Sequence, residues 1–268
     1  MSAATVSPSQ LADWLLARGQ HLVTTDQVAE LVGVDVGTVP VSLQRAREAR
    51  KMVSVTKGAW VPVPPEYRKA GAPPAIEYID PMMRHLGHPY YVGFLSAARL
   101  YGASHQAPMA LQVATPALLR NRRIGSSRIE FIRRTATADR PTQQHNVPTG
   151  RVTVATPAVV VYDLVESPQQ GAGLGNVSTV IGDLLDNEMV DEQALVDLAA
   201  AYPMRVVQRV GYLIEYMADE IGSPVEFDRL AELVRANGWT PLDSHRNADG
   251  ERDQRWRVVV NTEIEHDL

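Results

Sequence analysis

A proline-rich segment constrains the fold of this chain more than any other stretch. Residues 61–74 read VPVPPEYRKAGAPP and contain five prolines. Proline has no backbone N–H and a fixed φ, so this stretch cannot form a regular helix and is unfavourable for a central strand. We therefore predict a small N-terminal domain at residues 1–66, a linker at 67–75 and a larger domain at 76–268.

The pattern before this segment predicts three helices followed by a hairpin. The helices are expected at 8–18, from 25 to 33 and at 39–50, where apolar residues recur at helical spacing. Thr25 and Thr38 are the expected N-caps of the second and third helices. Two β-branched runs flank Lys57-Gly58, which indicates a tight turn. This order of elements is typical of a winged helix-turn-helix domain that binds DNA.

The third predicted helix is amphipathic. Val39, Leu43 and Ala46 share one face, and the opposite face carries Val41, Gln44, Arg45 and Glu48. In a winged domain such a face meets base edges, so Arg45 is expected to bond guanine and Gln44 adenine. The predicted DNA-binding residues are Thr38, Ser42, Gln44, Arg45, Arg47, Arg50, Lys51 and Lys57, of which Arg47, Arg50, Lys51 and Lys57 suit phosphates. The alternative is an ordinary solvated helix face.

Net charge is unevenly distributed along the chain. The total is −5, but residues 36–69 carry +5, residues 118–134 carry another +5, and residues 180–268 carry −11. The second basic stretch predicts an additional nucleic-acid surface, because cations that neutralise phosphates release counterions. Its arginines are Arg120, Arg122, Arg123, Arg128, Arg133 and Arg134. The alternative is a pair of strand edges that charge protects from aggregation.

The remainder of the chain predicts a mixed α/β domain with a helical C-terminal part, so the fold class is α+β. A helix is expected at 92–101, strands at 111–114, 129–133 and 151–154, and a last strand at 256–261. Five further helices are expected at 157–166, 176–187, 191–201, 204–221 and 226–237.

Composition excludes several classes of function. The chain has no cysteine, which excludes disulfides and thiolate metal sites. A secretory signal and a membrane-spanning stretch are not found, so we expect a cytoplasmic protein without a membrane partner. No lysine follows Lys69, and nucleotide-binding or hydrolase motifs are not found either, so no catalytic residue, cofactor or metal is predicted. Two alternatives remain: zinc at His85, His88 and His105, and an anion at the GAGLG run, residues 171–175.

Four segments of the chain resemble a known family. They read YYVGFLSAARLYGASHQAP (90–108), LQVATPALLRNRRIGSSRIEFIRR (111–134), VTVATPAVVVYDLV (152–165) and RVGYLIE (209–215). In combination they resemble the AbiEi antitoxins of type IV toxin–antitoxin operons, which act in abortive infection.

The resemblance implies a transcriptional repressor of its own operon with an AbiEi-like antitoxin domain at 76–268. It further implies a toxin partner that resembles a nucleotidyltransferase and is countered without stable contact. We expect a monomer in solution and two copies on inverted repeats in the promoter. The alternative is a nucleic-acid-modifying enzyme, a nuclease or nucleotidyltransferase-like protein that its winged domain directs to DNA or RNA.

Overall fold

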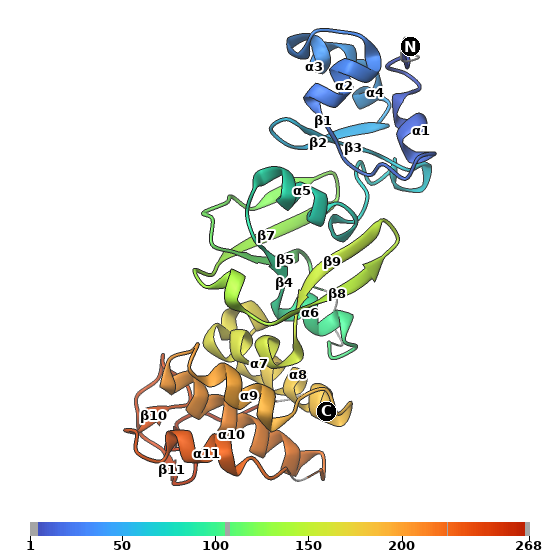
Figure 1. Ribbon diagram of the computed structural model, residues 1–268. Helices are drawn as coiled ribbons and strands as arrows, with labels where there is room; N and C mark the ends of the chain where they lie inside the picture. Colours follow the sequence, from blue (N-terminus) through green and yellow to red (C-terminus); the bar gives the residue numbers. More distant parts are fainter. Residues whose placement is uncertain (1–4, 105–107, 224, 266–268) are drawn as a thin grey trace. The chain divides into compact units, whose positions relative to one another are not determined.

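The computed structural model describes residues 5–104, 108–223 and 225–265, which form two compact units (Figure 1). The first unit combines the chain up to Val92 with Met109–Asp139 and Gln143–Val154. The second contains Gly93–Pro108, Arg140–Thr142 and the chain from Ala155 onward. The sequence predicts a different division of the chain, into domains at 1–66 and 76–268 that fold independently and a linker at 67–75. This division stays a prediction.

The N-terminal part of the first unit contains four short helices and a small sheet. The elements are α1 (Leu11–Leu16), β1 (Val23–Thr24), α2 (Thr25–Val32), the 3₁₀ turn Val36–Thr38, α3 (Val39–Ser42), α4 (Gln44–Glu48), β2 (Met52–Thr56) and β3 (Ala59–Pro62). Strands β2 and β3 pair antiparallel around Lys57 and Gly58, which confirms the predicted hairpin. Gly58 has a φ of 79°, as its place in the turn requires. Strand β1, which was not predicted, pairs with the other side of β3.

The N-cap of helix α2 (Thr25–Val32) lies one residue earlier than predicted. Thr24, not Thr25, is the N-cap: its hydroxyl accepts from the backbone N–H of Gln27 at 3.2 Å. The Gln27 side chain in turn accepts from the Thr24 N–H at 2.9 Å, which completes a capping box. Gly33 ends the helix with a φ of 75°, as expected from its position.

The predicted helix at 39–50 is divided into two. Leu43, with ψ near 0°, lies between α3 and α4. Thr38 is not a side-chain cap, because its hydroxyl donates to the Asp35 carbonyl at 2.7 Å. The backbone nevertheless keeps helical spacing, since the Leu43 N–H still bonds Val39 and the Arg47 N–H bonds Leu43. The expected single helix was therefore wrong in continuity but correct in the face that it buries.

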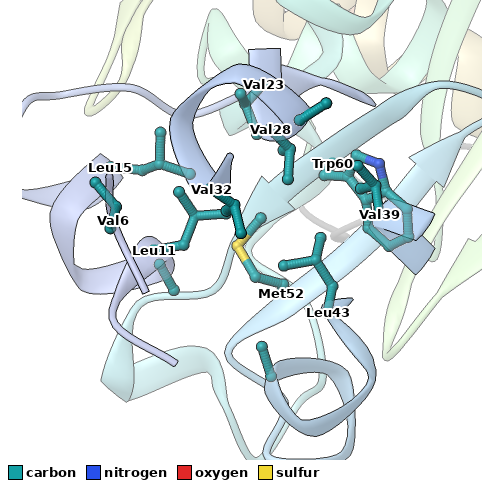
Figure 2. Packing of buried hydrophobic residues seen from close by; sticks show 13 residues of the cluster. Val6, Leu11, Leu15, Val23, Val28, Val32, Val39, Leu43, Met52 and Trp60 are labelled. Carbon is teal, nitrogen blue, oxygen red and sulfur yellow. The ribbon is translucent and has the colours of Figure 1, made fainter. Parts of the chain in front are cut away.

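A hydrophobic core holds these helices against the hairpin (Figure 2). Leu11 and Leu15 of α1, Leu43 between α3 and α4, and Met52 of β2 are almost completely buried. Each such side chain contributes about 1.5–3 kcal/mol to folding. Trp60 adds a polar link, because its indole N–H donates to the Thr25 hydroxyl at 3.0 Å. This core fixes which face of α3 and α4 points outward.

The proline-rich segment is ordered and packs within the first unit. It forms a 3₁₀ turn at Pro65–Tyr67, and a second 3₁₀ turn at Ala75–Glu77 and helix α5 (Ile79–Leu86) follow it. The Ala70 carbonyl accepts from the Ser126 N–H at 2.8 Å, and the Ser127 hydroxyl donates to the Pro73 carbonyl. A Cβ at Gly125 would lie 2.3 Å from the Ala70 oxygen, so only glycine fits there.

The rest of the first unit is built on a six-stranded mixed sheet with the order β6-β7-β5-β4-β9-β8. Its strands are β4 (Tyr91–Val92), β5 (Leu111–Thr115), β6 (Arg122–Ile124), β7 (Ser127–Arg133), β8 (Thr142–Val147) and β9 (Gly150–Ala155). The three strands predicted in this region correspond to β5, β7 and β9. Strands β4 and β6 are too short for a periodic signal, and β8, TQQHNV, lacks apolar alternation.

The second unit is mainly helical. It contains α6 (Phe94–Leu100), α7 (Pro157–Glu166), α8 (Leu174–Asp186), α9 (Glu192–Ala199), α10 (Met204–Glu220), α11 (Asp228–Val234) and the strands β10 (Thr240–Pro241), β11 (Glu251–Asp253) and β12 (Val258–Val260). The predicted helices and the last strand are all present with slightly different ends. Residues 158–165 of α7 are buried on every side, so this helix lies inside the unit. Gly211 of α10 packs directly on the Trp256 ring, and a Cβ there would lie 2.0 Å from it.

The architecture confirms a mixed α+β fold. In the part of the chain that the structure describes, no helix has the length and hydrophobicity needed to cross a membrane.

Candidate nucleic-acid interface

Helices α3 and α4 present one continuous outer surface, which we call the α3–α4 surface and define by Val41, Gln44, Arg45 and Glu48. All four side chains are exposed. Val39, Leu43 and Ala46 on the opposite side are at most 4% exposed, so the predicted amphipathic division is correct. Gln44 donates through Nε2 to the Glu48 carboxylate at 3.0 Å, which orders both side chains. The surface therefore presents a hydrogen-bonded Gln44–Glu48 pair beside the Arg45 guanidinium.

The cations on and next to this surface differ in their contacts with the rest of the protein. Arg45 is exposed and, within the described residues, makes neither a hydrogen bond nor an ion pair. Arg47 is exposed as well, and its guanidinium lies 5.8 Å from the centre of the Trp60 ring. Both side chains can therefore reach a ligand outside the protein without breaking a strong internal contact. Ser42, at the end of α3, is half-buried.

Two predicted phosphate-binding residues are engaged in internal contacts. Lys51 forms an ion pair with Asp13 at 3.2 Å, and Arg68 pairs with the same carboxylate at 3.0 Å. Arg50 donates to the Lys69 carbonyl at 2.9 Å. These contacts join α1 and the end of α4 to the proline-rich segment. Ion pairs this exposed contribute only about 0–1 kcal/mol, so Lys51 and Arg68 can exchange Asp13 for another anion at little cost.

Two backbone carbonyls of the hairpin contact later parts of the first unit, one at strand β6 and the other at helix α5. Val55 lies at a bulge in β2, without a register partner in β3, and its carbonyl accepts from Arg122 Nη1 at 3.0 Å. The Lys57 carbonyl lies 3.1 Å from His85 Nε2. The Lys57 side chain itself is exposed at the turn. We call these two contacts the hairpin latch, and they set the position of Lys57.

The hairpin latch also bears on the zinc alternative. The His85 ring is committed to the Lys57 carbonyl, and His105 lies outside the described residues. Over the described ranges, no group of three side chains that could hold a metal ion is present.

The six arginines of the second predicted patch do not form one face. In β6 and β7, Arg123 pairs with Arg128 and Arg122 pairs with Ile129. Directly opposed residues share a face and adjacent residues point to opposite faces, so Arg122 points away from Arg123 and Arg128. Arg133, four residues after Ile129, shares the side of Arg122, whereas Arg120 precedes β6 and is exposed. Arg134 follows β7 and is half-buried.

Arg122 is half-buried and donates to the hairpin, so it is engaged inside the protein rather than available to a ligand. Burial lowers the pKa of its guanidinium, and its Nε atom is completely buried. The exposed arginines on the other side, Arg123 and Arg128, lie directly opposite each other. Sequence counting could not make this distinction, because it depends on the register of two strands.

Comparison with known families decides the identity of the central part. Residues 91–216 match the family model described as the AbiEi antitoxin C-terminal domain. These residues belong to the AbiEi antitoxin family. The resemblance expected from the four sequence segments is thereby confirmed.

A solved structure shares the fold over nearly the whole chain. The crystal structure of the RV2827C protein from Mycobacterium tuberculosis superposes with a TM-score of 0.65 and 16% identity, and the alignment covers 96% of this chain and 93% of that one. An identity this low supports likeness of fold alone. No curated protein matches the chain.

The AbiEi match begins at β4 and ends within α10, so it contains the paired arginines Arg123 and Arg128 but not the α3–α4 surface. Within the AbiEi segment the glycine run opens helix α8 after Gly173, whose φ is 107°. A Cβ at Gly175 would lie 1.9 Å from the Glu265 carbonyl oxygen.

A cavity of about 890 Å³ adjoins this helix start. Four acidic residues line it, Asp249, Glu251, Glu263 and Glu265, against one basic residue, Arg246. Negative charges at this density repel an anion, so the anion alternative for the glycine run is disfavoured. The run is better explained by close packing of the chain against Gly175.

Proposed function

We propose that this protein is a DNA-binding antitoxin that represses its own promoter through a winged helix-turn-helix domain at residues 1–66. The observation that carries this proposal is the α3–α4 surface. A helix pair anchored by Val39 and Leu43 exposes Gln44 and Arg45 together, and a hairpin with an exposed lysine follows. The AbiEi match supports the antitoxin role.

The proposed mechanism separates base contacts from phosphate contacts. Arg45 donates two hydrogen bonds to a guanine edge, and Gln44, braced by Glu48, contacts the neighbouring adenine. Arg47 and Lys57 bind phosphates on either side and set the register. Thr38, Ser42, Arg50 and Lys51 stay candidates for flanking contacts, the last two after exchange of their internal partners for phosphates.

The second basic surface assists this binding with fewer residues than the sequence indicates. Arg123 and Arg128, which share one face of the β6–β7 hairpin, are the proposed pair, with Arg120, Arg133 and Arg134 near them along the chain. Each phosphate contact adds affinity without adding sequence preference.

A single winged domain reads few base pairs, so we propose that two monomers bind inverted repeats in the promoter. The antitoxin activity is proposed to counter a nucleotidyltransferase-like toxin without a stable complex. Repression and neutralisation then use separate parts of the chain.

Footprinting of the DNA upstream of the gene tests the repressor role. The full chain is expected to protect an inverted repeat, and Arg45→Ala is expected to abolish protection at the same protein concentration. Arg235→Ala is the matched control, because Arg235 is exposed in the second unit and its removal changes the net charge equally. Protection that survives the combined change Arg45→Ala and Lys51→Ala would refute the assigned surface.

Co-expression tests the antitoxin role. The chain is expected to restore growth of cells that express the neighbouring toxin gene, and Arg45→Ala is expected to restore it equally. Failure of the unchanged protein to restore growth would refute the antitoxin role.

A further inference from the structure

We propose that Val41 determines part of the operator sequence by contacting the C5-methyl group of a thymine in the major groove. This inference rests on the proposed function, because it requires the α3–α4 surface to enter that groove. It assigns a base preference to a residue whose side chain cannot form a hydrogen bond.

The Val41 side chain is 72% exposed, on a helix pair whose inner face is almost completely buried. Isolated exposed apolar residues are common on protein surfaces, so exposure alone decides little. The position of Val41 among its neighbours is what decides.

At 100° per residue, Val41 and Glu48 point almost directly away from the core, and Gln44 and Arg45 lie on either side of that direction. The exposure of all four side chains agrees with this arithmetic despite the break at Leu43. Val41 is therefore in the middle of the outward face, at its N-terminal end, where helices of this type contact base edges.

The outward face has a polar half, with Gln44, Arg45 and Glu48, and an apolar half, with Val41 and the exposed Pro40. In the major groove, hydrogen-bonding side chains read purine and cytosine edges, whereas the methyl group of thymine is the apolar feature. An apolar half next to an arginine therefore matches a thymine beside a guanine.

The spacing narrows the site further. Val41 and Arg45 are four residues apart, a rise of about 6 Å along a helix. Base pairs are separated by about 3.4 Å along the duplex axis. The thymine read by Val41 is therefore expected one or two base pairs from the guanine read by Arg45.

The experiment removes one methyl group at a time from the DNA. The probe is the shortest duplex that the full chain protects in footprinting of its own upstream region. Each thymine is replaced singly by deoxyuridine, which lacks only the C5-methyl. We expect one position per half-site at which binding weakens about threefold to tenfold, the effect of exposing one buried methyl contact.

Matched variants connect that position to Val41. With Val41→Ala, thymine and deoxyuridine at this position are expected to bind equally, whereas Val41→Ile keeps the difference. Val36→Ala is the control, because Val36 is also exposed, at 49%, but precedes α3. Thermal unfolding of each variant checks that folding is unchanged.

The outcomes separate this inference from the function on which it rests. Specific footprints with no sensitive thymine, or a sensitivity that persists in Val41→Ala, overturn the role of Val41 and leave the repressor intact. The absence of any specific footprint overturns both.

Discussion

Two stretches of this chain carry the same net charge of +5, and the structure uses them differently. In residues 36–69, helical periodicity gathers Gln44, Arg45 and Arg47 outside a buried face. In residues 118–134, strand alternation sends adjacent arginines to opposite sides, and Arg122 is engaged in a hydrogen bond to Val55. The comparison teaches that charge counts locate candidate surfaces, but the local geometry of the backbone decides how many of the charges reach a ligand.

The largest expected effect concerns the helical stretch. Arg45→Ala should weaken operator binding about 10-fold to 100-fold, because a bidentate contact to guanine contributes about 1–3 kcal/mol of discrimination. Titration at one fixed salt concentration measures it, with Arg235→Ala as the control. An equal loss in both variants would mean that Arg45 acts by net charge alone.

The next prediction separates two adjacent arginines in the strand stretch. Arg122→Ala should lower the free energy of unfolding by about 1–3 kcal/mol, because the bulged Val55 carbonyl loses its donor. Arg123→Ala, on the opposite face, should change it by less than about 0.5 kcal/mol. Urea unfolding of both variants gives the comparison. Equal free energies of unfolding would show that the hydrogen bond from Arg122 to Val55 does not stabilise the protein.

A smaller effect is expected for the exposed arginine pair. Arg123→Ala combined with Arg128→Ala should reduce the slope of log affinity against log salt by about 0.9 for each phosphate that the protein no longer neutralises. Sequence preference should remain unchanged. An unchanged salt slope would mean that Arg123 and Arg128 are solvated and do not contact the nucleic acid.

The smallest expected effect concerns the cations tied to Asp13. Asp13→Asn should free Lys51 and Arg68 and strengthen DNA binding about twofold to threefold, in keeping with the small free energy of exposed ion pairs. Binding at low salt is the suitable measurement, since screening weakens the effect. A weaker complex would indicate that the ion pairs position α1 for binding.

Much of the fold was predictable because its signals are local. The apolar spacing of Val39, Leu43 and Ala46 identified the buried face, and Lys57-Gly58 identified the hairpin turn. The cap of α2 was misplaced by one residue, because Thr24 and Thr25 are equally suitable until the reciprocal bond with Gln27 is seen. Strand β8 was missed because it contains no apolar alternation.

The candidate site was predictable in part for the same reason. Gln44, Arg45, Arg47 and Lys57 were predicted to bind DNA, and the structure places all four at the surface. The hairpin latch could not be predicted, because Arg122 and Val55 are 67 residues apart and His85 and Lys57 are 28 apart. No periodicity connects residues at such separations.

By itself, the sequence determined most of the longer helices and strands, which helix face is buried, and the resemblance to the AbiEi antitoxins. These properties depend on neighbours within a few residues, so their pattern is written along the chain. Only the tertiary structure decided which cations are available to a ligand. Availability depends on strand register and on distant carbonyl or carboxylate partners, which come together only when the chain has folded.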